Sequence, residues 1–243
     1  MAENDGGRGM LNLTEEQMQR LQKAVAEQAE EKAKEAVTRL DKTLDIAVDK
    51  LVKKGWTLPA ELNLPAINAL GNTNELDDVD AFMQMFYSCD EYRNMKNMIK
   101  GIRESHVREP LRKIVEECWI AFQNETYIIC ANSLLVVIEG ILSEFWDDKN
   151  NTRMMQVCQK QVDDFPEEGS TLKKHVWISY NTFIRDLYEF SKFDSEEPTK
   201  IKRHWFIHGR SEYDVNEVDC IKLFNAVHSI AMIVDIEYKN KSN

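Results

Sequence analysis

Apolar residues recur at intervals of three and four along most of this 243-residue chain, and no segment alternates apolar and polar residues as a half-buried strand does. Such spacing places apolar side chains on one face of a helix. In residues 215–238, for example, the apolar positions are Val218, Ile221, Leu223, Phe224, Val227, Ile230, Ala231 and Val234. The sequence therefore predicts an all-α protein whose main part is a bundle of about five helices.

A long helix is predicted near the N-terminus. Thr14, followed three residues later by Gln17, is typical of a capping box, in which the two side chains bond each other's backbone N–H groups. No glycine or proline interrupts residues 14–54. The apolar face of this helix weakens to alanines in its middle. Both a partly solvated helix that docks its C-terminal half and a coiled coil with a second chain fit this pattern.

Three parts are expected along the chain. Residues 1–10 are predicted to be a disordered tail, residues 11–74 a helical arm with its linker, and residues 75–243 the helical bundle. Gly55 is expected to end the long helix, and two prolines and a Gly-Asn cluster follow before residue 75. The boundary between arm and bundle is therefore placed near residue 75.

Charge and cysteine content limit the classes of function. A formal net charge of −11 argues against non-specific binding to nucleic acid or to an anionic membrane, although it leaves room for a local basic groove. Five cysteines without a CxxC pair indicate reduced thiols, not a disulfide framework or a zinc site. The most apolar run, residues 128–138, is shorter than a membrane span, and the N-terminus lacks the apolar core of a signal peptide. A cytoplasmic protein with no membrane partner is expected.

Side chains that could act in catalysis are most concentrated in residues 202–210, whose sequence is Lys-Arg-His-Trp-Phe-Ile-His-Gly-Arg. Two of the five histidines are here. An imidazole can transfer protons near neutral pH, and a guanidinium can grip a phosphate with two N–H groups. Phosphodiester chemistry without a metal needs these two groups. Arg203 and His208 are therefore the candidate catalytic residues, with His204 in a supporting role.

Other readings of these residues stay open. His204 and His208 are four apart, a spacing that can hold zinc, but the glutamate of an HExxH motif is absent and no third ligand is positioned by the sequence. No metal and no cofactor are therefore predicted. Arg203 and His208 could also cap helix ends or pair with carboxylates. Glu139 interrupts an apolar run and is expected beside the core, where it needs a partner such as Arg203 or His208. That partnership could orient the imidazole, or could only neutralise a charge.

An arginine, a polar residue, three further residues and a histidine, placed just before the last long helix of an all-α chain, resemble the RNase motif of the HEPN superfamily (higher eukaryotes and prokaryotes nucleotide-binding domains). The form Arg203-His204 followed by His208-Gly209 is similar to an Arg-His-x-x-x-His-Gly variant among bacterial and phage-defence-like members. The helix from Tyr127 that contains Glu139 also looks like those proteins. The resemblance covers roughly residues 105–238.

The resemblance implies a HEPN-like helical bundle that forms a homodimer, in which two motifs meet in a composite cleft and cut RNA without a metal. His208 would act as base or acid, Arg203 would hold the phosphate, and His204 fills the polar second position. Such proteins serve as toxins and in abortive infection or antiviral defence. Some have lost catalysis and act as dimerisation or nucleotide- or RNA-binding modules, which is the alternative for this chain.

Partners follow from charge and from the arm. Lys200, Lys202 and Arg210 make the motif the most basic stretch of the chain and are candidate RNA contacts. An acidic protein with one basic cleft is expected to take single-stranded RNA in preference to long duplexes. The arm, which the resemblance does not explain, is a candidate site for a regulatory protein partner.

Overall fold

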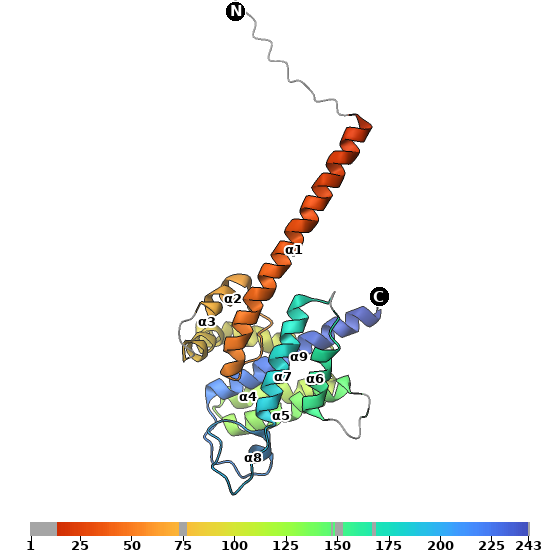
Figure 1. Ribbon diagram of the computed structural model, residues 1–243. Coiled ribbons are helices and arrows are strands. Elements are labelled where there is room, and N and C mark those ends of the chain that lie inside the picture. Colours follow the sequence, from red (N-terminus) through yellow and green to blue (C-terminus); the bar gives the residue numbers. More distant parts are fainter. Residues whose placement is uncertain (1–13, 73–76, 147, 149–152, 167–168, 243) are drawn as a thin grey trace, which may run out of the picture. The chain divides into compact units, whose positions relative to one another are not determined.

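The computed structural model describes residues 14–72, 77–146, 148, 153–166 and 169–242 (Figure 1). In that part of the chain 76% of the structure is helix and there is no strand, which confirms the all-α prediction. The tail predicted for residues 1–10 lies outside the described residues. The α-helices are α1 (Glu15–Lys53), α2 (Leu64–Gly71), α3 (Asp77–Glu104), α4 (Glu109–Gln123), α5 (Tyr127–Leu142), α6 (Met154–Asp163), α7 (Thr171–Leu187), α8 (Arg203–Ile207) and α9 (Glu217–Ser242).

The chain divides into two compact units, Met1–Lys42 and Thr43–Asn243. In the first unit, the described residues form the N-terminal part of α1. The predicted capping box is present: the backbone N–H of Thr14 donates to Gln17 Oε1 at 3.0 Å, and that of Gln17 donates to Thr14 Oγ1 at 3.3 Å. The apolar side chains of this unit are exposed, namely Met18, Leu21, Val25 and Val37.

The second unit begins earlier than the sequence predicts, at residue 43 and not near residue 75. Trp56 and Thr57 are fully buried. The Thr57 hydroxyl lies 3.0 Å from Ser229 Oγ, and Asn225 Nδ2 donates to the Thr57 carbonyl at 2.9 Å, so α9 satisfies the polar groups of this segment. Glycine and proline mark where the chain changes direction, but they do not report burial. The last turns of α1 also join this core through Leu44, Ala47, Val48 and Leu51.

Two helices, α5 and α9, form the centre of the second unit. Helix α9 crosses the middle of the unit and packs against α3, α5 and α7, while α5 packs against α4 and α9 (Figure 1). The sequence predicts one helix from Tyr127 to Trp146, whereas α5 ends at Leu142 and continues as a 3-10 turn, Ser143–Phe145. By length and composition alone, Tyr127–Phe145 could cross a membrane. A core helix passes the same test, and 44% of this span is buried.

Helix α3 is kinked, and helix α9 begins later than the sequence predicts. Inside α3, three consecutive residues, Asp90, Glu91 and Tyr92, have positive φ angles of 51°, 54° and 61°, and the helix kinks there. At the start of α9 a capping box is predicted from Asp214. The structure places it two residues later: the Asp219 backbone N–H donates to Asn216 Oδ1 at 3.2 Å, and the Asn216 N–H donates to Asp219 Oδ2 at 3.1 Å.

Candidate functional site

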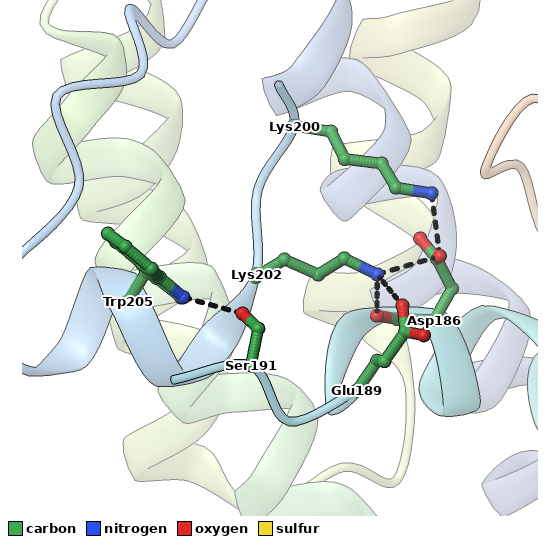
Figure 2. A network of polar contacts seen from close by, with 6 residues as sticks. All are labelled: Asp186, Glu189, Ser191, Lys200, Lys202 and Trp205. Carbon is green, nitrogen blue, oxygen red and sulfur yellow. Dashed lines mark hydrogen bonds and ion pairs between the residues drawn. The ribbon is translucent and has the colours of Figure 1, made fainter. Parts of the chain in front are cut away.

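The motif helix α8 is fixed to the end of α7 by the residues on its inner side. Lys202, just before α8, is 5% exposed, and its Nζ donates to Asp186 Oδ1 at 2.9 Å, to the Asp186 carbonyl at 2.6 Å and to Glu189 Oε2 at 2.7 Å (Figure 2). Trp205 Nε1 donates to Ser191 Oγ at 2.7 Å in the same view. These bonds anchor α8 from one side.

The anchor changes the role of one predicted RNA contact. A lysine ammonium has three donors, and the fold takes up all three donors of Lys202. Lys200 is exposed and pairs with Asp186 at 2.6 Å. Burial by itself would raise the pKa of Asp186, but the two lysines outweigh burial and lower that pKa. The sequence shows a run of basic residues without showing which of them points inward.

Arg203 is held from α5. Its Nε donates to Glu139 Oε1 at 2.7 Å, and its Nη2 lies 3.5 Å from Glu139 Oε2. The Tyr188 hydroxyl donates to the same Oε1 at 2.7 Å, and the guanidinium lies 5.6 Å from the centre of the Tyr188 ring. Burial, followed by the Glu139 hydrogen bond, raises the pKa of Tyr188. The expectation that Glu139 has a cationic partner is confirmed, and that partner is Arg203.

Glu139 stands at the end of an exposed stripe on α5. Ile128, Asn132 and Val136 precede it at intervals of four, four and three residues, which places all four side chains on one face of the helix. The side chains of Ile128 and Val136 are 55% and 52% exposed, unusual values for such large apolar residues in the most apolar helix of the chain. The stripe therefore leads along α5 to the Arg203 ion pair.

The two motif histidines belong to a group of rings that we call the aromatic–histidine cluster, made of Phe190, Phe193, His204 and His208. The His204 ring stacks on Phe193 with centroids 4.4 Å apart and an interplanar angle of 11°. His208 is exposed, and its ring lies 5.0 Å from that of His204 and 5.9 Å from that of Phe193. The Arg210 guanidinium lies 5.1 Å from the Phe193 ring centre.

The sequence pointed to neither phenylalanine as a functional residue, and its helical pattern placed Phe190 on the buried side of the preceding helix, which is wrong. Phe190 is 69% exposed and Phe193 37% exposed. The segment that holds Phe193, residues 191–199, is otherwise charged and polar. A lone aromatic residue in such a loop is the signal that could have found it, because a large apolar side chain without a core position often serves a binding surface.

The structure brings the candidate catalytic residues to one short helix but gives them different neighbours. Arg203 contacts Glu139 and Tyr188, whereas His208 contacts Phe193 and His204. Helix α8 ends at Ile207, and His208 follows as its C-cap residue. The next residue, Gly209, has a φ of 60° that suits glycine, and its N–H donates to the Phe206 carbonyl. His208 thus sits at the C-terminal end of α8 and Arg203 at its start.

In the described part of the chain, no group of three or more His, Cys, Asp or Glu side chains is placed to hold a metal ion. His204 and His208 are joined by no third ligand among these residues. The five cysteines are free thiols, and all except Cys89 are buried.

Comparison with known protein families, with curated proteins and with solved structures gave no match. The function of this chain is therefore inferred from its own residues and their geometry.

Proposed function

We propose that this protein is a metal-independent endoribonuclease of HEPN type that cuts single-stranded RNA. One observation carries the proposal: α8 is anchored through Lys202 and Trp205, while Arg203, His204 and His208 lie on its more exposed side. A guanidinium and an imidazole held on a rigid element are preorganised for a phosphodiester, because little reorganisation is needed when the substrate arrives.

The reaction needs two proton transfers. The ribose 2′-OH loses its proton to a base, and its oxygen attacks the adjacent phosphorus. The bond from phosphorus to the 5′-oxygen breaks, and that oxygen takes a proton from an acid. The products are a 2′,3′-cyclic phosphate and a 5′-hydroxyl. His208 supplies one of the two transfers, a contribution typically worth about 10²–10⁴-fold.

Arg203 stabilises the charge that builds on the phosphate. Its Nε and Nη2 face Glu139, and Nη1 makes no hydrogen bond to any residue that the structure describes. Glu139 and Tyr188 thus fix the plane of the guanidinium and leave an N–H edge for a phosphate oxygen. A planar fork that binds a carboxylate on one edge and a phosphate on another is a geometry that lysine cannot reproduce.

The surface around the motif suits single-stranded RNA. Phe190 and Phe193 present exposed rings, and the stacking of a base on such a ring contributes about 1–3 kcal/mol. Arg210 and Lys200 are exposed and supply positive charge for the backbone. Lys202 is left out of this set, because its donors are taken up by Asp186 and Glu189.

The active form is a homodimer. One catalytic histidine per chain leaves one of the two proton transfers without a group, and a second copy supplies it. The exposed stripe of α5 offers the contact: its apolar side chains, Ile128 and Val136, lead to Glu139 and so to Arg203. Burial of two such stripes against each other would bring both motifs to the dimer axis.

The biological setting is also a proposal. A ribonuclease that needs no cofactor would suit a cytoplasmic toxin. It would also suit a protein of abortive infection or antiviral defence. The exposed apolar residues of the first unit, Leu21, Val25 and Val37, would then take a regulatory protein partner.

A second function is favoured by one observation. Two of the Arg203 donors already bond Glu139, which is how an arginine behaves when it only neutralises a partly buried carboxylate. In that case the chain is a non-catalytic HEPN-like dimerisation or RNA-binding module. Incubation of the purified protein with mixed RNAs in EDTA, followed by end-group analysis, separates the two. Fragments with 2′,3′-cyclic phosphate ends support the nuclease, whereas intact RNA supports the binding module.

A further inference from the structure

A cavity of about 360 Å³ lies between α3, α4 and the start of α5, a size typical of small-ligand sites. Aromatic residues form much of its wall: Tyr92, Trp119, Phe122 and Tyr127. None of these residues belongs to the motif helix or to its anchor. The cavity therefore needs an explanation apart from RNA cleavage.

Three of the rings pack against the fourth, Phe122, in different planes. The Trp119 ring is nearly parallel to it at 5.4 Å and 16°, whereas the Tyr92 ring stands at 85° and the Tyr127 ring at 63°, both at 5.8 Å. Four rings in several planes therefore line one cavity, an arrangement similar to an aromatic cage. The face of an aromatic ring carries negative charge, so such a cage attracts a cation that has an apolar shell.

The rim of the cavity adds full negative charge. Glu91 and Glu125 line it, and the Tyr92 hydroxyl donates to Glu217 just behind it. That hydrogen bond, together with burial, raises the pKa of Tyr92 to about 12. Lys96 is the one basic residue among the lining residues. Three carboxylates against one ammonium favour a cationic ligand over a phosphate-bearing one.

The backbone around the cavity is held in an unfavourable conformation. In the described part of the chain, four residues other than glycine have positive φ: Asp90, Glu91, Tyr92 and Glu125. Three of these four line the cavity. Non-glycine residues adopt this region at an energetic cost, and such residues gather at functional sites.

Glu125 shows this most clearly, because it can be compared with two glycines. Helices α1, α4 and α8 end with the same pair of backbone bonds, a Schellman motif whose C′ residue needs a positive φ. That residue is Gly55 in α1 and Gly209 in α8, with φ of 77° and 60°. In α4 it is Glu125, with φ of 57°. A carboxylate at the cavity rim stands where glycine fits without strain.

We propose that this cavity binds an alkylated ammonium group, either of a small quaternary amine or of a methylated lysine side chain. The aromatic walls hold the methyl groups and the ring faces attract the charge. Glu125 and Glu91 at the rim stabilise it further. The ammonium stays intact on binding, so no covalent step is involved, and the proposal does not depend on RNA cleavage.

Calorimetric titration of the full chain tests the proposal with matched probes. Choline and a peptide that contains trimethyllysine represent the two sources of the ammonium. The neutral isostere 3,3-dimethylbutan-1-ol and the unmodified lysine peptide are their controls. The expected result is that at least one methylated cation binds about tenfold or more tightly than its control, as expected for a desolvated cation–π contact. Equal binding of cation and control, no binding of either cation, or displacement of choline by AMP would overturn the proposal.

Two variants test whether the cation binds in this cavity. Trp119→Leu removes one wall and should weaken binding at least about fivefold. Glu125→Gly removes a rim carboxylate while relieving the positive φ, so it should weaken binding yet raise the melting temperature, an outcome that general damage to the fold cannot produce. Glu117→Gln, an exposed carboxylate of α4 outside the cavity, should leave binding unchanged. Unchanged binding in Glu125→Gly and in Trp119→Leu would place the cation elsewhere and refute the assignment.

Discussion

Arg203 Nε lies 2.7 Å from Glu139 Oε1, so one ion pair joins the motif helix α8 to the exposed face of α5. Both side chains are partly exposed, at 32% and 25%. Exposed pairs of this kind contribute little to stability, so the pair serves mainly to set the orientation of the guanidinium. We expect this orientation to leave one N–H edge of Arg203 for a phosphate oxygen.

Arg203→Lys should abolish RNA cleavage while changing the free energy of unfolding by less than about 1 kcal/mol. The lysine ammonium keeps the positive charge, but it lacks the planar guanidinium that can bond Glu139 through one edge and a phosphate through another. Cleavage rates and urea unfolding measure the two effects. Arg108→Lys is the matched control, because Arg108 Nε pairs with Glu144 at 2.6 Å on an exposed surface. If Arg203→Lys cuts RNA at the wild-type rate, the proposed role of the guanidinium is wrong.

Asp186→Asn should destabilise the fold by about 2 kcal/mol or more, since it weakens the pairing of a nearly buried lysine ammonium, Lys202. Glu189→Gln removes the other carboxylate from the same ammonium, but Glu189 is 67% exposed, so the cost should stay below about 1 kcal/mol. Urea unfolding at neutral pH measures both. Equal losses in the two variants would show that Asp186 is not the anchor.

The pH dependence of the free energy of unfolding tests the same pairing of Asp186 with Lys202. The pKa of Asp186 is lower in the folded state than in the unfolded chain, where an Asp titrates near about 3.9. Its contribution is therefore present above that pH and is lost as the pH falls through the folded-state pKa. The stability difference between the wild type and Asp186→Asn should narrow below about pH 4. A difference that stays constant from pH 7 to pH 3 would contradict this assignment.

A fragment of residues 43–243 should fold, whereas a fragment of residues 75–243 should not. The longer fragment keeps Trp56 and Thr57, which are fully buried, and the bonds from Thr57 to Asn225 and Ser229. The shorter fragment would leave those polar groups of α9 without partners in the core. Far-UV circular dichroism and thermal unfolding compare the two. A cooperative transition in the shorter fragment would restore the domain boundary predicted near residue 75.

Val136→Arg should dissociate the proposed dimer, because it places a charge in the middle of the exposed stripe of α5. Sedimentation at micromolar concentration should show a dimer for the wild type and a monomer for the variant. Met155→Arg changes another exposed apolar side chain, on α6, and should leave the dimer intact. A wild-type monomer that is fully active on RNA would rule out a shared active site.

Local patterns in the sequence predicted the helices well, because apolar spacing and caps depend on neighbouring residues. The Thr14–Gln17 capping box is where the sequence places it. The position of the Thr57 segment could not be predicted in this way. Its polar groups are satisfied by Asn225 and Ser229, more than a hundred residues away, and no local pattern reports such a partner.

The candidate site likewise has features that the sequence predicts and features that it does not. The Arg203–Glu139 pair was predictable, because a carboxylate in an apolar run needs a cation. The inward direction of the Lys202 side chain was not predictable, because the sequence does not distinguish it from the other basic residues of the run. The aromatic wall of the cavity comes from three helices, and the positive φ of Glu125 is visible only in the backbone.

The most direct test of the proposed nuclease activity is the cleavage of RNA by His208→Ala, compared with His106→Ala. His106 is also exposed and stacks on another ring, that of Tyr238, but it lies outside the motif. The wild type and His106→Ala should cut RNA in EDTA, leave 2′,3′-cyclic phosphate ends, and spare substrates with 2′-deoxyribose at the scissile position. His208→Ala should be inactive, with its unfolding free energy within about 1 kcal/mol of the wild type. Cleavage by His208→Ala at the wild-type rate, or its loss on addition of EDTA to the wild type, would contradict the mechanism.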